Sequence, residues 1–160
     1  MTVHVIELTG ENLESAIPAL ANLRIQIFRE WPYLYDGDLA YEEAYLKRFR
    51  KADRAFLAVA KDGEDIVGAA TAAPLSGEEY AFKNPFESAG YDTTKIFYFA
   101  ESLLLPAYRG RGIGHQFFDA REAHARSFDT YTHTAFCAVV RTESHPKKPQ
   151  HYHPLDGFWQ

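Results

Sequence analysis

The stretch that most constrains the fold is residues 103–115, LLLPAYRGRGIGH, where an apolar strand pattern runs through a proline into a glycine-rich turn and a helix. The turn lacks Cβ atoms at alternate positions, which leaves its backbone open to a ligand at Gly110, Gly112 and Gly114. Successive N–H groups of such a turn, continued by those of the first helical turn, form a concave anion site. Arg109 and Arg111 add positive charges that can fork onto phosphate oxygens. The stretch therefore predicts a pyrophosphate-binding loop.

The spacing of the glycines separates this loop from other phosphate-binding turns. A Walker loop requires a lysine and a hydroxyl residue after its last glycine, and neither follows here. A dinucleotide fingerprint requires Gly-x-Gly-x-x-Gly early in a βαβ unit, whereas this turn lies deep in the chain. The pattern Arg109-x-x-Gly112-x-Gly114 resembles instead the acyl-CoA pyrophosphate loop of the GNAT superfamily of acyl-CoA-dependent N-acyltransferases, and Pro106 and Tyr108 match its common form. The alternative is an ordinary strand-to-helix turn that is rich in glycine.

Length and composition predict one soluble domain. The 160 residues are enough for a single core, and 46% hydrophobic with 24% charged residues is ordinary for a folded protein. No apolar run approaches the roughly 20 residues that cross a bilayer, and the N-terminus shows no signal-peptide pattern. A net charge of −5 argues against a general nucleic-acid binder, and the single Cys137 fits a reducing cytoplasm. We therefore expect a cytoplasmic protein with neither nucleic-acid nor membrane partners.

Hydrophobic periodicity predicts elements in the order β-α-α-β-β-β-α-β, with a further helix opening at residue 154. The expected strands are residues 3–8, 54–61, 65–74, 96–105 and 134–141, and the expected helices are residues 11–31, 39–50 and 112–128. Pro18 is expected in the first turn of the main helix, after a looser turn. Residues 76–95 are long for a hairpin connection, and such connections are often functional lids.

This order of elements is similar to the GNAT fold over essentially the whole chain. The resemblance implies one domain over residues 1–160, of the α/β (α+β) class, with a mixed, mostly antiparallel central sheet flanked by helices and containing a splayed strand pair. That fold normally closes with a helix and two further strands, for which this sequence has no residues. We favour a chain that lacks the usual C-terminal strands over a sheet that is completed in another way.

The resemblance also implies the activity: an N-acetyltransferase in which an amine attacks acetyl-CoA directly. In the family, the strand before the phosphate loop is splayed from its neighbour by a bulge, and the acyl-CoA arm lies in the gap. The N–H of Leu104 matches the position that polarises the thioester carbonyl, with Leu103 and Leu105 beside it. An ordinary core strand is the alternative, and both can hold because the backbone does the binding. The remaining cofactor-binding positions are those of the loop and helix start: Arg109, Gly110, Arg111, Gly112, Ile113, Gly114 and His115.

Direct acetyl transfer needs a base for the ammonium proton and an acid for the thiolate. Glu101, eight residues before Arg109, lies where many family members carry a carboxylate, and we expect it to accept the proton directly or through water. The alternative is a structural carboxylate paired with a nearby arginine or tyrosine. Family members often supply the acid from a tyrosine, but Trp159 stands in that place and its indole N–H is not acidic enough. Tyr152 matches no family position, so the acid stays unassigned.

Each of two further groups of polar residues has a structural and a functional interpretation. Four residues are of types that bind zinc: His145, His151, His153 and Cys137. Their spacing does not match that of zinc ligands, so we expect no metal site. We expect the histidines to lie at the surface and the cysteine to lie in the core. Solvated charge is expected of the acidic residues in and after the first helix–helix loop, Asp36, Asp38, Glu42 and Glu43. Because the resemblance places this loop at the acceptor site, these carboxylates are also candidates for attracting an amine.

The expected partners are acetyl-CoA as acyl donor and a small-molecule or peptide amine as acceptor. Dimers are common among proteins that this chain resembles, which leaves a homodimer open. The alternative function is a non-catalytic acyl-CoA-binding sensor or partner module, motivated by the missing tyrosine and the missing strands. A nucleotide-phosphate transferase is disfavoured because the Walker lysine and magnesium ligands are absent.

Overall fold

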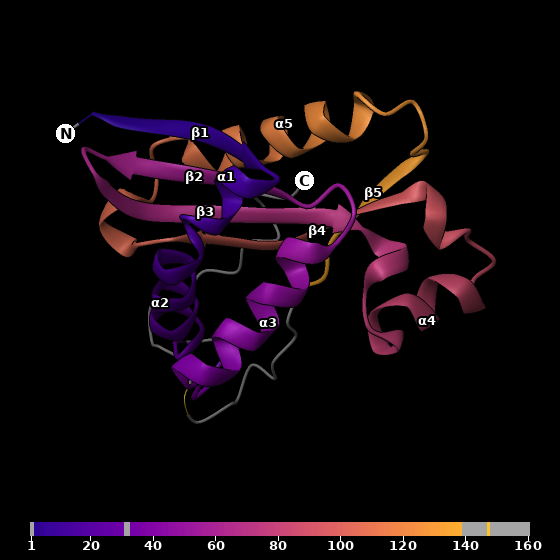
Figure 1. Cartoon of the computed structure of the whole chain (residues 1–160), viewed down its shortest axis with the longest axis horizontal. Helices are drawn as coiled ribbons and strands as arrows, with labels where there is room; N and C mark the ends of the chain where they lie inside the picture. Colours follow the sequence, from indigo (N-terminus) through magenta and orange to yellow (C-terminus); the bar gives the residue numbers. More distant parts are fainter. Residues whose placement is uncertain (1, 31–32, 139–146, 148–160) are drawn as a thin grey trace.

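The described strands form one open sheet with helices on both of its faces (Figure 1). The computed structural model describes residues 2–30, 33–138 and 147. The strands lie across the sheet in sequence order: β1 (Val3–Thr9), β2 (Phe56–Asp62), β3 (Asp65–Pro74), β4 (Ile96–Leu104) and β5 (His133–Ala135). The first four are antiparallel neighbours, and β5 runs parallel to β4. This confirms the mixed, mostly antiparallel sheet expected from the sequence.

The sheet separates two main apolar cores, one on each of its faces. The helices are α1 (Glu11–Glu14), α2 (Ile17–Phe28), α3 (Leu39–Lys51), α4 (Tyr80–Ser88) and α5 (Ile113–Arg126), with short 3-10 turns η1 (Leu75–Gly77), η2 (Thr93–Lys95) and η3 (Pro106–Tyr108). The first core joins α1, α2 and α3 to one face, and the second joins α5 to the other (Figure 1). The sheet is therefore buried on both sides through most of β2 and β3.

Local sequence signals explain where these helices begin. Pro18 lies in the first turn of α2, where its missing N–H leaves no hydrogen bond unmade, as predicted. The expected helix over residues 11–31 is two helices, α1 and α2, with the break at Ser15 and Ala16. The Asp38 carboxylate accepts a hydrogen bond of 2.8 Å from the Tyr41 N–H and so caps α3.

Two segments differ from the sequence-based expectation. Residues 76–95, expected as a lid of undefined structure, contain α4, which buries no residue and lies beyond one end of the sheet (Figure 1). The buried strand expected over residues 134–141 is wrong for its described part, residues 134–138, since β5 ends at Ala135 and lies at the edge of the sheet. Cys137 is exposed, so its expected place in the core is also wrong. An apolar run at a sheet edge is buried only where another element covers it.

Several expectations fall on residues that the structure does not describe. They are the helix opening at residue 154, the three histidines His145, His151 and His153, Tyr152, and the aromatic pair Phe158 and Trp159. Among the described residues, no helix is long and apolar enough to cross a bilayer.

Candidate active site

β4 and β5 pair only at the start of β4. The pairing joins Ile96–Tyr98 to His133–Ala135, and the rest of β4 has no strand on that side in the described part of the chain. β5 ends at Ala135, so the splayed strand pair expected from the sequence stays a prediction. In the described part of the chain, no strand pairs with this edge of β4 from Phe99 to Leu104, directly before the glycine-rich loop.

A bulge interrupts the other edge of β4, where it pairs with β3. Ala72 pairs with Phe99, but the preceding residue, Thr71, pairs with Glu101, so Ala100 is the extra residue on β4. A bulge of this kind breaks the regular ladder of hydrogen bonds at the inserted residue. It also changes which face of the sheet the following side chains occupy.

The change of face decides where Glu101 lies. Before the bulge, Phe97 and Phe99 belong to the core that contains α5. After it, Leu103 belongs to the core that contains α2 and α3, although all three have odd numbers in the same strand. Without the extra residue, alternation would place Glu101 on the α5 face. The bulge therefore turns the Glu101 carboxylate towards α2.

The open edge of β4 presents the N–H of Leu104. The Leu105 N–H donates to the Val67 carbonyl at 3.0 Å, on the β3 side of the strand. Because successive N–H groups of a strand point to opposite edges, the Leu104 N–H points away from β3, towards the gap. The Leu105 N–H is already used within the protein, so any contact of Leu105 with a ligand would come from its side chain or from its carbonyl.

The glycine-rich loop has the backbone geometry that its sequence predicts. Gly110 and Gly112 have φ angles of 78° and 81°, in the left-handed region that favours glycine. Gly112 is the N-cap of α5 and supplies no side-chain cap, so the first N–H groups of the helix, on Ile113 and Gly114, have no partner within the helix. A Cβ at Gly112 would meet no described atom within 4 Å apart from those of its two chain neighbours. The loop is therefore open on the side where a ligand would lie.

Side chains of the loop fasten it to the end of β4 and to β2. The Arg109 Nε donates to the Leu104 carbonyl at 3.0 Å, and the Arg111 Nη2 donates to the Ala107 carbonyl at 3.1 Å. The Tyr108 hydroxyl donates to the Asp62 carboxylate at 2.7 Å, and this bond raises the pKa of Tyr108. Both arginines remain exposed, with positive charge beside the N-terminus of α5.

Glu101 is held by a buried arginine from α2. Arg24, 6% exposed, forms ion pairs with Glu101 on β4 and with Glu42 on α3. Glu42 is further bonded by the Tyr35 hydroxyl at 3.0 Å, and burial with this bond raises the pKa of Tyr35 to about 12. The Arg24 guanidinium also lies over the Tyr45 ring, 4.3 Å from its centroid. One guanidinium thus pairs with two carboxylates, and only Glu42 also accepts a hydrogen bond from the Tyr35 hydroxyl.

The second oxygen of Glu101 is unused. Its Oε2 is buried and has no hydrogen-bond partner among the described residues, and the same holds for the hydroxyl of Thr71, its neighbour across the β3–β4 pair. The carboxylate is thus fixed through Oε1 and retains an acceptor at Oε2. Oε2 is therefore the Glu101 oxygen whose hydrogen-bonding capacity the described residues leave unused.

A sequence profile described as the acetyltransferase (GNAT) family matches residues 18–146. The chain belongs to this family. The acyl donor of the family is acetyl-CoA, which confirms the co-substrate expected from the sequence. No curated protein sequence matches this GNAT chain.

Solved structures with the same fold include several acetyltransferases. The aminoglycoside N-acetyltransferase AAC(6')-Iy in complex with CoA has a TM-score of 0.62 at 16% identity, over 86% of this chain and 78% of that chain. An aminoglycoside acetyltransferase from an uncultured soil metagenomic sample, in complex with trehalose, has a TM-score of 0.58 at 18% identity, over 86% and 78%. A ribosomal-protein-alanine N-acetyltransferase from Brucella melitensis biovar Abortus 2308 has 0.55 at 15%, over 84% and 80%. At these identities the likeness concerns the fold.

Within this GNAT fold, the acidic residues of the first helix–helix loop separate into different roles. Glu42 is fully buried in the pair with Arg24, so the expectation of a solvated charge is wrong for it. Asp38 caps α3, and Asp36 is exposed, 3.9 Å from Arg29. Glu43 is exposed, as expected.

Arg24 was not predicted as a site residue, although the sequence indicates that it is buried. Arg24 lies four residues after Leu20 and three before Ile27, in the middle of the apolar stripe that predicts the helix. A charged residue on a buried helix face requires a partner of opposite charge. The pattern therefore indicated a buried ion pair, but not that Glu42 and Glu101 would share it.

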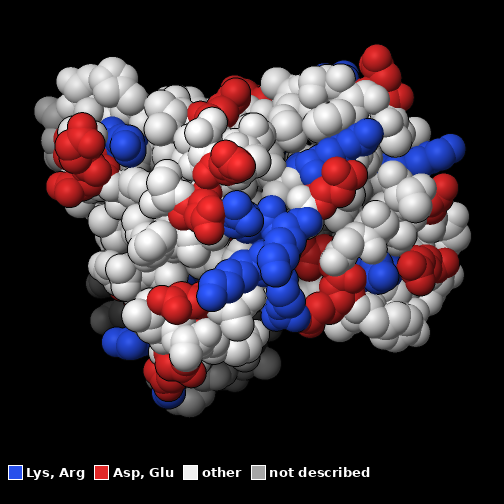
Figure 2. Space-filling view, in the orientation of Figure 1, with Lys and Arg blue, Asp and Glu red and all other residues white. Residues whose placement is uncertain are grey.

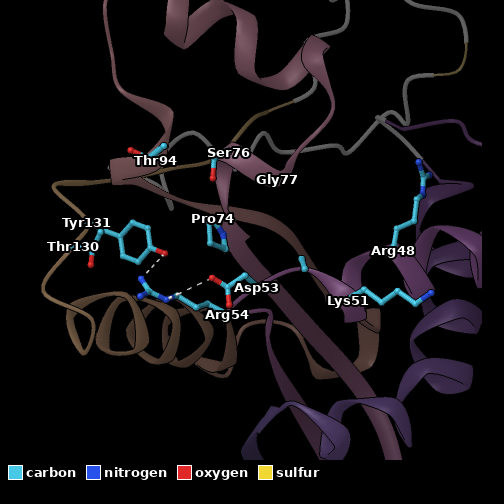
Figure 3. A pocket seen from close by; sticks show the side chains of 11 residues that line it. Arg48, Lys51, Asp53, Arg54, Pro74, Ser76, Gly77, Thr94, Thr130 and Tyr131 are labelled. Atoms are coloured by element: carbon cyan, nitrogen blue, oxygen red, sulfur yellow. Dashed lines mark hydrogen bonds and ion pairs between the residues drawn. The ribbon is translucent and has the colours of Figure 1, made fainter.

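A separate hollow of about 490 Å³ is drawn in Figure 3. Pro74, which lines it, pairs with Phe97 near the start of β4, whereas the glycine-rich loop follows the other end of β4. In Figure 3, Arg54 points towards Tyr131, whose hydroxyl accepts its hydrogen bond of 3.1 Å. Arg48 and Lys51 line the hollow from the last turn of α3, where positive charge complements the helix C-terminus. Basic side chains gather in the middle of the face in Figure 2, with acidic ones around them. None of the predicted site residues lines this hollow.

Proposed function

We propose that this protein transfers an acetyl group from acetyl-CoA to a primary amine of a small molecule or peptide, by direct attack of the amine on the thioester. The observation that carries the proposal is one continuous unit, β4 followed by the glycine-rich loop and α5. It presents a buried carboxylate, an open strand edge and an uncapped helix N-terminus in succession. These are the groups that proton removal, thioester polarisation and pyrophosphate binding require.

The donor half of the site is the loop with the open edge of β4. The N–H groups of Ile113 and Gly114 and the charges of Arg109 and Arg111 would bind the pyrophosphate. Gly110, Leu103, Leu105 and His115 complete the set of residues proposed to contact acetyl-CoA. The N–H of Leu104 faces the gap and would donate to the thioester oxygen as negative charge develops there.

In the acceptor half, Glu101 Oε2 removes a proton from the ammonium form of the acceptor, directly or through water. The free amine then attacks the thioester carbonyl carbon, a C–N bond forms, the C–S bond breaks, and the CoA thiolate leaves. The attacking nitrogen loses its second proton in this step, and the proton passes to the departing thiolate, directly or through water. Two neighbouring structures are an aminoglycoside acetyltransferase and a ribosomal-protein-alanine acetyltransferase. Amino sugars and N-terminal alanine peptides are therefore the first acceptor classes to test.

Binding is tested first, by thermal unfolding with acetyl-CoA, CoA and ATP on the wild type and on Gly112→Trp. A ligand at 100 times its dissociation constant stabilises the folded state by roughly 2.7 kcal/mol. We expect both CoA compounds to raise the melting temperature of the wild type, ATP to have less effect, and Gly112→Trp to lose the shift. Absence of any shift with CoA compounds would contradict the proposal.

Turnover is tested by thiol release from acetyl-CoA with a panel that contains an aminoglycoside, an alanine-terminated peptide and simple polyamines. We expect release that depends on the amine and is lost with Glu101→Gln. Binding of acetyl-CoA without release for any amine would favour the non-catalytic acyl-CoA-binding module instead.

A further inference from the structure

A second buried arginine approaches the β4 bulge from the face opposite Arg24. Arg121 on α5 is 1% exposed and is the largest fully buried side chain of the described residues. No acidic side chain in the described part of the chain forms an ion pair with it. Burial lowers the pKa of Arg121 to about 9, which leaves the guanidinium charged at neutral pH.

The Arg121 guanidinium donates hydrogen bonds to β3 and β4 at the bulge. Nη1 donates to the carbonyls of Thr71 at 3.3 Å and of Glu101 at 3.0 Å. Nη2 donates to the Ser102 hydroxyl at 2.8 Å, and Nε returns to the Phe117 carbonyl of α5 at 3.2 Å. Thr71 and Glu101 are the strand partners that flank the extra residue. Arg121 therefore bridges β3 and β4 next to the bulge, where the regular ladder of hydrogen bonds is interrupted.

Two aromatic rings close the remaining sides of the guanidinium. Its central carbon lies 4.6 Å from the ring centroid of Phe99 and 4.7 Å from that of Phe118. Such contacts partly compensate a desolvated cation. The side chain is thus fixed in one place by α5, by both strands and by the rings, and its position sets that of the Glu101 backbone.

We propose that Arg121 is a positioning residue, which holds the β4 bulge and thereby aims the Glu101 carboxylate at the acetyl-transfer site. The inference rests on the proposed function, because it assigns Arg121 a role through the base. Arg121 also lies on the helix whose N-terminus binds the pyrophosphate, so α5 fixes both halves of the site relative to one another.

The test compares Arg121→Lys and Arg121→Met with Arg126→Met, a matched change on the exposed side of the same helix, where Arg126 pairs with Glu122 at 2.9 Å. Lysine retains the charge but cannot donate to both carbonyls and to Ser102 in one plane. Each variant is assayed well below its own melting temperature. Since a misplacement of about 1 Å costs up to about a hundred-fold, we expect kcat to fall at least about ten-fold for both Arg121 variants, with acetyl-CoA affinity within about three-fold.

A merely structural role is separated by repeating Arg121→Lys in a Glu101→Gln background. If Arg121 acts through Glu101, the second substitution changes kcat by less than about three-fold there. An equal fall in both backgrounds, or a variant with wild-type kcat, would overturn the proposal.

Hydrogen exchange supplies a readout that needs no activity. The amides of residues 99–105 are expected to exchange faster in Arg121→Lys than in Arg126→Met, and unchanged exchange would overturn the positioning role. A wild type that neither binds acetyl-CoA nor turns over would instead defeat the proposed function, and the exchange result would still decide whether Arg121 holds the bulge.

Discussion

At Glu101, a buried carboxylate is held through one oxygen only, since Arg24 contacts Oε1 while Oε2 has no hydrogen-bond partner among the described residues. Glu42 competes for the same guanidinium and has the Tyr35 hydroxyl in addition. Of the two carboxylates, Glu101 therefore has the less satisfied charge. A proton is accommodated at Oε2 without loss of the contact to Arg24.

Replacement of this carboxylate by its amide tests its role as the base. We expect Glu101→Gln to lower kcat about a hundred-fold, because general base catalysis contributes about that much, and to leave acetyl-CoA affinity nearly unchanged. Steady-state kinetics and calorimetry measure the two quantities. Glu11→Gln, an exposed change of the same chemistry on α1, is the control and should have wild-type kcat. A Glu101→Gln enzyme as fast as the control would remove Glu101 from the mechanism.

Gly112 and Gly90 allow backbone strain to be separated from ligand contact. Both have positive φ, 81° and 90°, and at neither position would an added Cβ meet an atom of the other described residues within 4 Å, chain neighbours aside. Alanine at either should destabilise the fold by about 1 kcal/mol, through left-handed strain. Only Gly112→Ala should also weaken acetyl-CoA binding, because its methyl group points into the open loop. Equal affinities in the two variants, measured by calorimetry, would argue against ligand contact at Gly112.

At the scale of elements, α3 matters because it carries Glu42 and Tyr45 to Arg24. Its N-terminus depends on the Asp38 cap, which is exposed and makes one hydrogen bond to the Tyr41 N–H. We expect Asp38→Ala to lower the free energy of unfolding by about 1 kcal/mol, as for other N-caps. Asp36→Ala, which removes only an exposed pair of 3.9 Å, should change it little. Urea unfolding of both variants measures the difference, and equal stabilities would show that the cap contributes nothing.

The elements that sequence predicted best are those with strong local signals. Alternation identified β2 and β3, and Pro18, Asp38 and Gly112 lie at helix starts that follow capping rules. α4 was missed because Pro85 lies inside it and no residue of it is buried, so neither propensity nor an apolar stripe predicts it. β5 was overextended because an apolar run does not reveal what covers it.

The candidate site was also predictable only where the local sequence carries a signal. The loop could be recognised from its glycine spacing, since the chemistry lies in the backbone. The surroundings of Glu101 could not, because its face depends on the inserted residue Ala100. The resemblance implied a bulge in this strand, but a run of mostly apolar residues does not show at which residue the bulge lies. Arg24 and Arg121 lie on different helices, far from Glu101 in sequence, and only the fold brings them to it.

In the whole molecule, the sheet separates two cores, and a side chain from each core contacts Glu101 at the β4 bulge. Arg24 reaches the Glu101 side chain from the core of α2 and α3, and Arg121 reaches the Glu101 carbonyl from the core of α5. The α5 core also contains His124, whose ring stacks on Phe56 at 4.5 Å and contacts Phe97 at 5.6 Å. Its Nε2 is buried without a hydrogen-bond partner among the described residues.

His124 should make the stability of the whole fold sensitive to acid. Burial lowers its pKa below the ordinary value, and a hydrogen bond to the Arg54 backbone and the charge of Glu7 only partly oppose this. Above about pH 6.5, both the folded and the unfolded chain hold a neutral imidazole, so the group contributes nothing to the pH dependence. Below it, the unfolded chain takes up the proton first, and the free energy of unfolding falls.

We therefore expect the urea midpoint to fall between pH 7.5 and 5.0 less steeply in His124→Phe than in the wild type. Phenylalanine retains the aromatic packing and cannot be protonated. His4→Gln, a change of an exposed histidine on β1, should leave the slope at its wild-type value. If His124→Phe has the same slope as the wild type, the acid sensitivity of this fold comes from its carboxylates and not from the α5 core.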